Sequence, residues 1–298
     1  MLATAKCDII YKNVRSLLGG ERVKYIVCNS ETAVLNRMYD EFEKNLEDGA
    51  VISLPEHIIN TQFTNRMIDD NKMGKYSYKH VIMLGQREFA DIDIEESFGL
   101  YRFARLKLLK KLDVDMKNVY YSECLDSENS TEDLEKYKEV LEENPIDVAI
   151  VFLGADGGIL DYRYATEDNK DIHLVEFSDE ERDQLRASGM EIKGNKLVSI
   201  GYENLMSARN LFVVVLGADK RKYIAELFEN EDTENKTILS ILNEHKNLII
   251  FTDKEASYKS EEEVNRLIKH RQRQQEAKLR AEKEQEEVAE NEEKAEDR

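Results

Sequence analysis

Residues 154–158, Gly-Ala-Asp-Gly-Gly, place one carboxylate among three glycines directly after the apolar run 148–153. Glycine lets backbone amides approach a ligand closely and adopts positive φ without strain. The Asp156 carboxylate could accept or relay a proton from a substrate held at this turn. It could equally hydrogen-bond the amides of its own turn, as Asp commonly does in loops, and take no part in chemistry.

Other catalytic and metal-binding patterns are missing from the sequence. Cys7, Cys28 and Cys124 are odd in number and widely spaced, which supports neither a disulfide framework nor a zinc site. Ser53 and Ser97 have no His and acid at a spacing typical of a hydrolase triad. The glycine string matches neither the dinucleotide-binding pattern nor the P-loop. We therefore expect reduced cysteines, no metal and no cofactor.

The charge of the chain argues against several classes of partner. It has 43 basic and 62 acidic residues, a formal net charge of −19 at pH 7, and no strong basic cluster in its folded part. Such a surface repels nucleic acid and anionic membranes. The longest apolar runs are about six residues, far below the ~20 that span a bilayer, and no signal peptide is visible. We expect a soluble, cytoplasmic protein that binds neither nucleic acid nor membranes.

The elements that position Asp156 follow an alternating pattern. Short β-branched or aliphatic runs are each followed by a turn and an amphipathic segment, which is typical of parallel strands joined by crossover helices. The predicted strands are 22–28, 50–54, 79–84, 118–121, 147–153, 196–200, 211–216 and 248–252. The pattern predicts an α/β fold with an open, mostly parallel, doubly wound sheet and flanking helices.

Apolar residues at helical spacing mark the crossover helices. Leu35, Met38, Phe42 and Leu46 form one buried stripe, and Ser30 is placed to cap its helix. Further stripes are predicted over 100–108, over 134–141 with a capping pattern from Ser130 to Asp133, and over 224–228. We interpret these residues as core packing and not as a cofactor site.

Two terminal segments differ from this pattern. Residues 1–20 are expected to be an irregular N-terminal extension, and residues 21–260 to form the α/β domain. Residues 261–298 are highly charged, with acid–base pairs three or four apart but no continuous apolar seam. They predict a charged helical or disordered tail, and the sharper alternative is an arm that binds a protein partner.

Three stretches resemble the glucosamine-6-phosphate deaminase and 6-phosphogluconolactonase family. They are IDVAIVFLGADGG, KLVSIGYENLMSARNLFVVVLGADKRKYIAELF and ILSILNEHKNLIIFTDKEA, and the resemblance spans roughly residues 22–258. It rests on a strand ending in G-x-D-G, a later strand ending in G-x-x-K, a helix with a late His and a final strand ending in T-D. The resemblance implies an open α/β sheet and a site for hexose 6-phosphates that needs no metal, and so an isomerase, deaminase or hydrolase of carbohydrate metabolism.

Two residues carry the family's pattern at its expected places. The resemblance puts Asp156 on the family's loop Asp and Lys220 on its phosphate-contacting Lys. Two nearby positions depart from it. Gly158 stands where the family has a His, and Arg163 stands where the deaminase branch has a Glu.

The same resemblance identifies departures after two earlier strands. Gln86 and Arg87 in VIMLGQREF stand where the deaminases have an Asp-Glu pair that holds the general base, and Gln takes up no proton at neutral pH. The phosphate loop is reduced to ISLPEHIIN, in which Ser53 survives but Glu56 adds a repelling charge. The resulting candidate substrate-binding residues are Gly154, Gly157, Gly158, Lys220, Ser53 and Gln86, with Asp156 as the candidate catalytic residue.

These departures leave two hypotheses open. The first is a divergent sugar-phosphate enzyme whose proton transfer has moved to Asp156, Glu88 or Asp161. The second is a catalytically degenerate protein that binds the ligand or regulates a partner through the fold and the tail, because each lost acid–base group costs ~10²–10⁴ in rate. His245 is expected to have no catalytic duty, because the resembling family often has a His at this place without one. A homo-oligomer and a purely structural scaffold are further alternatives.

Overall fold

The large sheet carries the elements on which the candidate site depends. The computed structural model of the chain describes residues 7–14, 23–93, 95, 99–177, 179, 182–183, 195–229 and 237–257. Within them, eight strands lie in the order β1-β2-β11-β10-β7-β3-β4-β6, and every neighbouring pair except β1 and β2 is parallel. The strands are β1 (Cys7–Val14), β2 (Val23–Cys28), β3 (Val51–Leu54), β4 (Ile82–Gly85), β6 (Val119–Tyr120), β7 (Val148–Phe152), β10 (Asn210–Val215) and β11 (Leu248–Asp253). The predicted α/β fold with a mostly parallel sheet is confirmed.

The chain also forms a second sheet, which has three antiparallel strands. It has the order β5-β9-β8 and is built from β5 (Arg87–Phe89), β8 (His173–Glu176) and β9 (Lys196–Ser199). The predicted strand 196–200 is β9, so it lies outside the parallel sheet. Only Gln86 separates β4 from β5. The chain therefore passes from one sheet to the other at the carboxyl end of β4.

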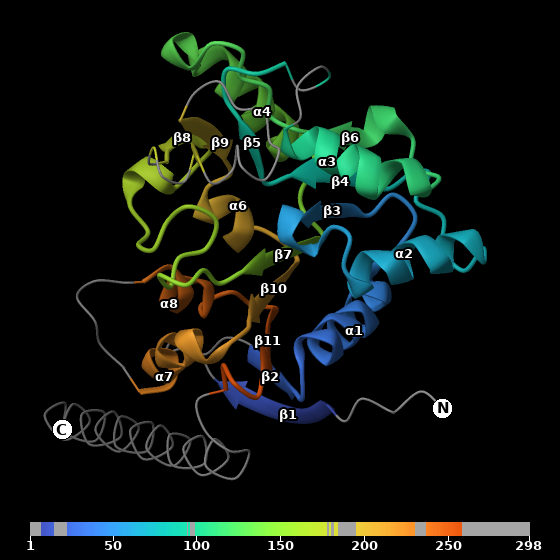
Figure 1. Cartoon of the computed structure of the whole chain (residues 1–298), viewed down its shortest axis with the longest axis vertical. Coiled ribbons are helices and arrows are strands. Elements are labelled where there is room, and N and C mark those ends of the chain that lie inside the picture. The colour runs from blue at the N-terminus through green and yellow to red at the C-terminus, as the bar shows by residue number, and fades with distance from the viewer. Residues whose placement is uncertain are drawn as a thin grey trace, which may run out of the picture. The chain divides into compact units, whose positions relative to one another are not determined.

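Helices cover both faces of the large sheet. Figure 1 shows α1 and α2 on one side of the strands and α6, α7 and α8 on the other. Residues 148–151 of β7 and 211–215 of β10 are almost completely buried, as expected for parallel strands between two helical layers. The helices are α1 (Glu31–Phe42), α2 (Gln62–Lys72), α3 (Leu100–Lys107), α4 (Thr131–Glu143), α6 (Tyr202–Met206), α7 (Arg221–Glu229) and α8 (Ile238–Leu242).

The predicted helix start at Ser30 is confirmed, and the one at Ser130 is wrong in its detail. The Ser30 hydroxyl accepts a hydrogen bond from the Ala33 N–H at 3.3 Å. The Ser130 side chain makes no capping bond, because its backbone is already helical (φ −73°, ψ −12°). A capping side chain bonds the first amides from an extended backbone conformation.

The N-terminal segment corrects another expectation. Residues 7–14 of the expected irregular extension form β1, which pairs antiparallel with β2 from Cys7 opposite Cys28 to Val14 opposite Val23. An unpaired edge strand exposes a row of backbone donors and acceptors, and β1 covers that row on β2. The domain boundaries at residues 20 and 260 stay predictions, and residues 261–298 lie outside the described part of the chain.

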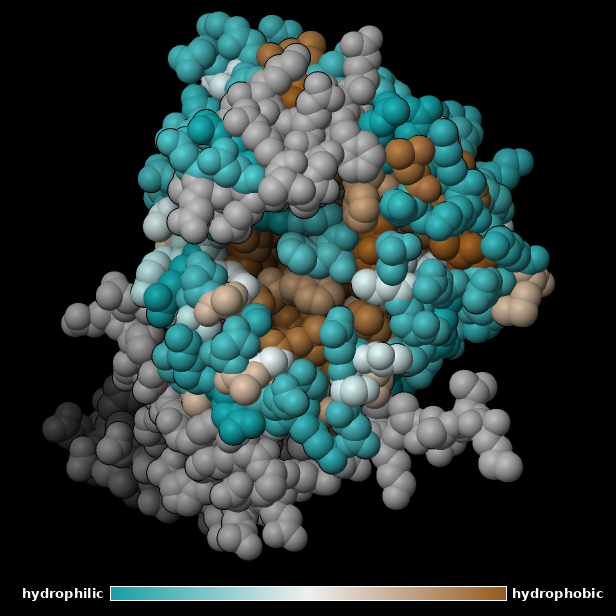
Figure 2. Space-filling view, viewed as in Figure 1, coloured by the Kyte–Doolittle hydropathy of each residue, from teal (hydrophilic) through white to brown (hydrophobic). Residues whose placement is uncertain are grey.

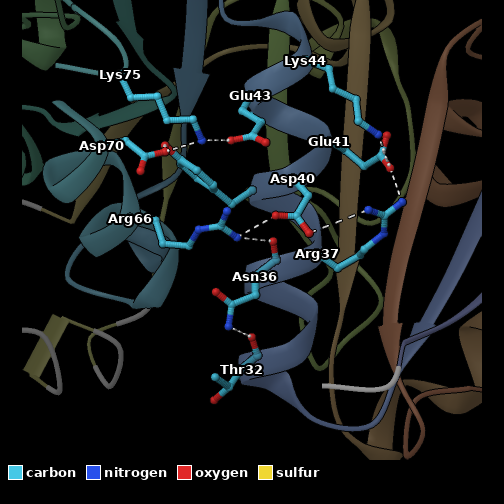
Figure 3. Close-up of polar contacts among 11 residues, drawn as sticks. Thr32, Asn36, Arg37, Asp40, Glu41, Glu43, Lys44, Arg66, Asp70 and Lys75 are labelled. Atoms are coloured by element: carbon cyan, nitrogen blue, oxygen red, sulfur yellow. Dashed lines mark hydrogen bonds and ion pairs between the residues drawn. The ribbon is translucent and has the colours of Figure 1, made fainter. Parts of the chain in front are cut away.

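Ion pairs fasten α2 onto α1 (Figure 3). Arg66 lies 2.8 Å from the Asp40 carboxylate, and Lys75 bridges Glu43 at 2.7 Å and Asp70 at 3.1 Å. These contacts join residues of the two helices and their ends, so we interpret them as structural. Among the described residues, every helix is too short or too polar to cross a membrane.

Candidate ligand site at the carboxyl edge of the sheet

Two glycine-containing turns leave the sheet side by side. β7 and β10 are parallel neighbours, with Phe152 opposite Val214, so turn 154–158 after β7 and turn 217–220 after β10 start at the same edge. Ligands of open parallel sheets bind outside the carboxyl ends of the strands. The two turns that the sequence singles out therefore meet where such a ligand would lie.

Hydrogen bonds within turn 154–158 fix the place of the carboxylate. The Gly154 N–H donates to the Gly158 carbonyl oxygen at 2.7 Å, and the Gly157 N–H donates to the Gly154 carbonyl oxygen at 3.1 Å. The Gly158 N–H donates to Asp156 Oδ1 at 2.9 Å, while Asp156 itself is exposed. Asp156 thus closes its own turn and remains open to solvent. This geometry is compatible with both roles considered for Asp156 from the sequence, namely proton transfer and closure of its own turn.

Tyr223 of α7 joins the two turns. Its hydroxyl donates to the Ala155 carbonyl oxygen at 3.2 Å, and its ring packs so closely under Gly157 that an added Cβ would lie 2.5 Å from it. Gly157 has φ +86°, which also favours glycine. Sequence analysis missed Tyr223, because nothing in its spacing separates it from core residues of the same helix.

Lys220 ends a short 3₁₀ helix, Ala218–Lys220, directly before α7. Its ammonium lies 3.1 Å from the Asp219 carboxylate, and the side chain is 18% exposed. This hydrogen bond lowers the pKa of Asp219. Gly217, at φ +91°, begins the turn and donates its N–H to the Asp253 carboxylate at the end of β11. The turn is therefore tied to the next strand of the sheet.

Figure 2 shows a hollow in the middle of the visible face, in the region where Figure 1 draws β7 and β10. Hydrophobic residues form its floor and hydrophilic residues its rim. An apolar floor with polar groups at the rim is typical of small-molecule sites. Within the described part of the chain, no group of three or more His, Cys, Asp or Glu side chains is placed to hold a metal ion.

The chain is similar to known sugar-phosphate enzymes in sequence. It is 24% identical over 208 residues to a glucosamine-6-phosphate deaminase of Mycoplasmopsis pulmonis, covering 68% of this chain and 81% of the relative. It is 22% identical over 245 residues to a glucosamine-6-phosphate deaminase of Mycoplasma mycoides, covering 80% of this chain and 97% of the relative. No family model matches the chain.

Solved structures agree with these relatives. A monomeric glucosamine-6-phosphate deaminase superposes with a TM-score of 0.66 at 14% identity, covering 78% of this chain and 98% of that one. The 6-phosphogluconolactonase of Trypanosoma cruzi gives a TM-score of 0.61 at 12% identity, covering 80% and 96%. The chain thus has the fold of glucosamine-6-phosphate deaminases and 6-phosphogluconolactonases, and its sequence is similar to those of the deaminases. The resemblance stated from the sequence motifs is confirmed.

Two of the residues expected to bind a substrate of this family are used inside the sheet. Gln86 is 2% exposed, and its amide nitrogen donates to the Ile150 carbonyl oxygen at 2.7 Å and the Ser53 carbonyl oxygen at 3.2 Å. Ser53 is fully buried, and its hydroxyl donates to the Leu84 carbonyl oxygen. Both side chains connect strands, and neither belongs to the site proposed below.

An ion-pair cluster occupies the positions where the deaminase resemblance implies a phosphate loop and a base. Arg87 pairs with Glu56 on one side and with Asp161, at 2.6 Å, on the other. All three side chains are about four-fifths buried or more. The repelling charge expected from Glu56 is therefore compensated by Arg87. Sequence analysis missed this cluster, because its members are 31 and 74 residues apart in the chain.

His57 lies beside this cluster. Its ring stacks on Phe152, with ring centroids 6.0 Å apart, at the end of β7. Burial lowers the pKa of His57, and the nearby Asp161 carboxylate opposes that shift. A neutral imidazole at the end of β7 can accept a hydrogen bond, and it adds little positive charge for a phosphate.

Glu88, one of the candidate replacement acids, is fully buried. Its carboxylate accepts hydrogen bonds from the N–H groups of Phe89, Leu100 and Tyr101 at 2.8, 2.9 and 2.5 Å. Burial raises its pKa to about 7, although these three bonds favour the charged form. Glu88 therefore anchors the first turn of α3 and is closed to solvent.

The remaining candidate lies elsewhere. His245 is buried before β11, with Nε2 2.7 Å from the Ala208 carbonyl oxygen and Nδ1 accepting the Asn247 N–H, and burial lowers its pKa. It lies at the amino end of β11, away from the two turns.

Proposed function

We propose that this chain binds a hexose 6-phosphate at the two joined turns and acts on it as a divergent isomerase, deaminase or lactonase-like enzyme. The observation that carries the proposal is the position of Tyr223, which contacts turn 154–158 and follows Lys220 by three residues. The exposed Asp156 carboxylate and the Lys220 ammonium group thus lie on adjacent turns. The relationship to the deaminase and lactonase family supports the class of ligand.

Each residue of the proposed site has a distinct role. Lys220 contacts the phosphate, whose charge it partly neutralises. Gly154, Gly157 and Gly158 keep the turn free of side chains, so that a sugar can approach its backbone. Asp156 is the general base that takes a proton from the bound sugar. Hexosamine phosphates, with an amino group beside the sugar carbonyl carbon, belong to the same ligand class.

A ligand-binding protein without turnover is the second candidate. It is favoured by one observation: Gln86 and Arg87, which stand where the resemblance implies the deaminase base, are committed to strand carbonyls and to Glu56 and Asp161. Loss of a positioned acid or base typically lowers the rate by ~10²–10⁴. The two candidates share the binding site and differ in whether Asp156 transfers a proton.

The test measures turnover and binding separately. The protein is incubated with glucosamine 6-phosphate and, in a second assay, with the 6-phosphogluconolactone, and ammonia release and ring opening are followed. We expect Asp156→Asn to lower the rate by ~10²–10⁴, because the amide accepts no proton. Asp69→Asn, which removes the same charge from an exposed position on α2, should leave the rate unchanged.

The outcomes separate the candidates. Equal rates for the wild type and Asp156→Asn would remove Asp156 from the mechanism. Ligand binding without any turnover would select the second candidate. A wild-type protein that neither binds nor converts either compound would overturn the proposed function. A cytoplasmic location, self-association and a protein partner for residues 261–298 stay predictions from the sequence.

A further inference from the structure

Several cations gather around Tyr223 in this otherwise acidic chain. The Arg163 guanidinium carbon lies 5.7 Å from the centroid of the Tyr223 ring and 5.3 Å from that of the Tyr164 ring. The Lys222 ammonium lies 4.7 Å from the Tyr223 ring. Lys220 precedes Tyr223 by three residues across one continuous helical stretch. Against a net charge of −19, these residues form a local group of cations, in which Lys220 pairs with Asp219.

The backbone of Arg163 is held in place, while its side chain is exposed. The Ile238 N–H at the start of α8 donates to the Arg163 carbonyl oxygen at 2.8 Å, and Tyr164 forms a bridge with Thr237. Among the described residues, no carboxylate forms an ion pair with Arg163; its described side-chain contacts are the two tyrosine rings. Within the described part of the chain, Arg163 thus presents an exposed positive charge without an acidic partner.

Tyr223 links the Arg163 side chain to the candidate site. Residues three apart on a helix share a face, so Lys220 and Tyr223 lie on the same side of the helical stretch. Tyr223 also contacts Ala155 and Gly157 in the turn that carries Asp156. Tyr223 therefore contacts both the Arg163 side chain and the turn that carries Asp156, and it belongs to the helical stretch on which Lys220 lies.

We propose that Arg163 binds the phosphate of the ligand together with Lys220, and that the Tyr223 ring positions the Arg163 side chain. This inference rests on the proposed function, since it assigns a second phosphate contact to the same site. A guanidinium that lies over an aromatic ring can still donate hydrogen bonds in its own plane. Its paired N–H groups match two phosphate oxygens.

The substitution at residue 163 changes the chemistry available there. The deaminase resemblance implies a Glu at this position, and this chain has Arg. An acidic group that could transfer a proton is thereby exchanged for a cation that attracts an anion. Two cations beside the turn also oppose the repulsion that an acidic protein exerts on a phosphate dianion.

The test is calorimetric titration of the full chain with glucosamine 6-phosphate and with glucosamine. We expect Arg163→Met to weaken binding of glucosamine 6-phosphate by about tenfold or more, because a charge-assisted, two-point contact is lost. Arg163→Lys should bind with intermediate affinity, since it keeps the charge and loses the paired donors. Binding of glucosamine, which lacks the phosphate, should not change between the variants.

Arg209→Met is the matched control. Arg209 is 69% exposed, precedes β10 and pairs with Asp147, so it lies at the opposite edge of the sheet. Its variant removes the same charge and should bind glucosamine 6-phosphate within about twofold of the wild type, since long-range effects of single exposed charges are screened. Equal thermal melting curves for the two Met variants would exclude loss of fold as the cause.

The results distinguish this inference from the proposed function. If the wild type binds and Arg163→Met binds equally well, Arg163 is not a phosphate contact and the proposed function stands. If Arg163→Met weakens glucosamine and glucosamine 6-phosphate alike, the contact is to the sugar, and the phosphate assignment is wrong. If the wild type binds neither probe, both the inference and the proposed function are overturned.

Discussion

Glu88 is a carboxyl group whose buried environment raises its pKa. Its buried carboxyl has a pKa of about 7, compared with 4.5 for an ordinary Glu, and three backbone N–H groups point at it. The unfolded chain therefore releases this proton at lower pH than the folded chain does. Stability contributed by the protonated form is present below about pH 4.5 and is lost as the pH rises through 7.

Glu88→Gln tests this linkage. Between pH 4.5 and pH 7, the free energy of unfolding of the wild type should fall relative to that of the variant by about 3 kcal/mol, since each pKa unit corresponds to 1.36 kcal/mol. Urea unfolding at several pH values measures this difference. Glu128→Gln, an exposed control, should follow the wild type. Parallel curves for the wild type and Glu88→Gln would show that the proton is not linked to folding.

Single residues of the site differ in how far the sequence predicts them. The turn around Asp156 is recognisable because glycines directly follow an apolar strand, and this signal is local. The contacts of Arg87 are not recognisable, because Glu56 and Asp161 come from other loops. Ser53 shows the reverse case. It matches a family position in sequence, yet burial commits its hydroxyl to Leu84.

The turn after β7 is the element on which the proposed site depends. Gly157 has positive φ and no space for a Cβ against Tyr223, whereas Gly74 has positive φ and open space around it. These two positions separate backbone strain from loss of packing. A side chain added at either position strains the backbone. Only a side chain added at Gly157 would also displace a tyrosine ring.

Replacing each glycine with Ala tests this difference. Gly74→Ala should lower the free energy of unfolding by about 1 kcal/mol through strain and leave ligand binding unchanged. Gly157→Ala should cost more and weaken binding of glucosamine 6-phosphate, because the Tyr223 ring must move. Urea unfolding and calorimetric titration measure the two effects. Equal losses of stability and unchanged binding would show that the contact with Tyr223 does not position the site.

Elements were predictable where a local pattern exists. The stripe of Leu35, Met38 and Phe42 and the cap at Ser30 predict α1 correctly. The strands β1, β5 and β8 were not predicted. Of these, β5 pairs with β9, which is distant in sequence, whereas β1 and β8 pair with the next strand along the chain. Helix α2 was not predicted either. Its buried residues are interspersed with Thr64 and Asp70, which weakens the apolar stripe.

At the scale of the whole molecule, the carboxyl edge is divided by charge. Arg87 with its two carboxylate partners lies at the end of β4 and beside β3 and β7, with a net negative charge. Arg163 and Lys220 lie toward the end of β10. Turn 154–158 stands between them in the strand order. A phosphorylated sugar would therefore place its phosphate toward β10 and its carbons toward Asp156.

The overall architecture followed from alternation of strands and helices, which is a property of the whole sequence. The division of charge at the edge did not follow from it. Net charge and composition describe the average surface, while the positive group around Tyr223 arises from two chain segments about 60 residues apart. Such groups depend on which loops the strand order brings together.

Amide hydrogen exchange of the full chain, with and without glucosamine 6-phosphate, tests the central claim most directly. A ligand held at the carboxyl edge should slow exchange in peptides that cover 154–164 and 217–223, because bound ligand suppresses local opening of the backbone it contacts. Glucosamine, which lacks the phosphate, should protect 217–223 much less. Unchanged exchange in both peptides, with protection at the opposite edge or nowhere, would contradict a sugar-phosphate site at these turns.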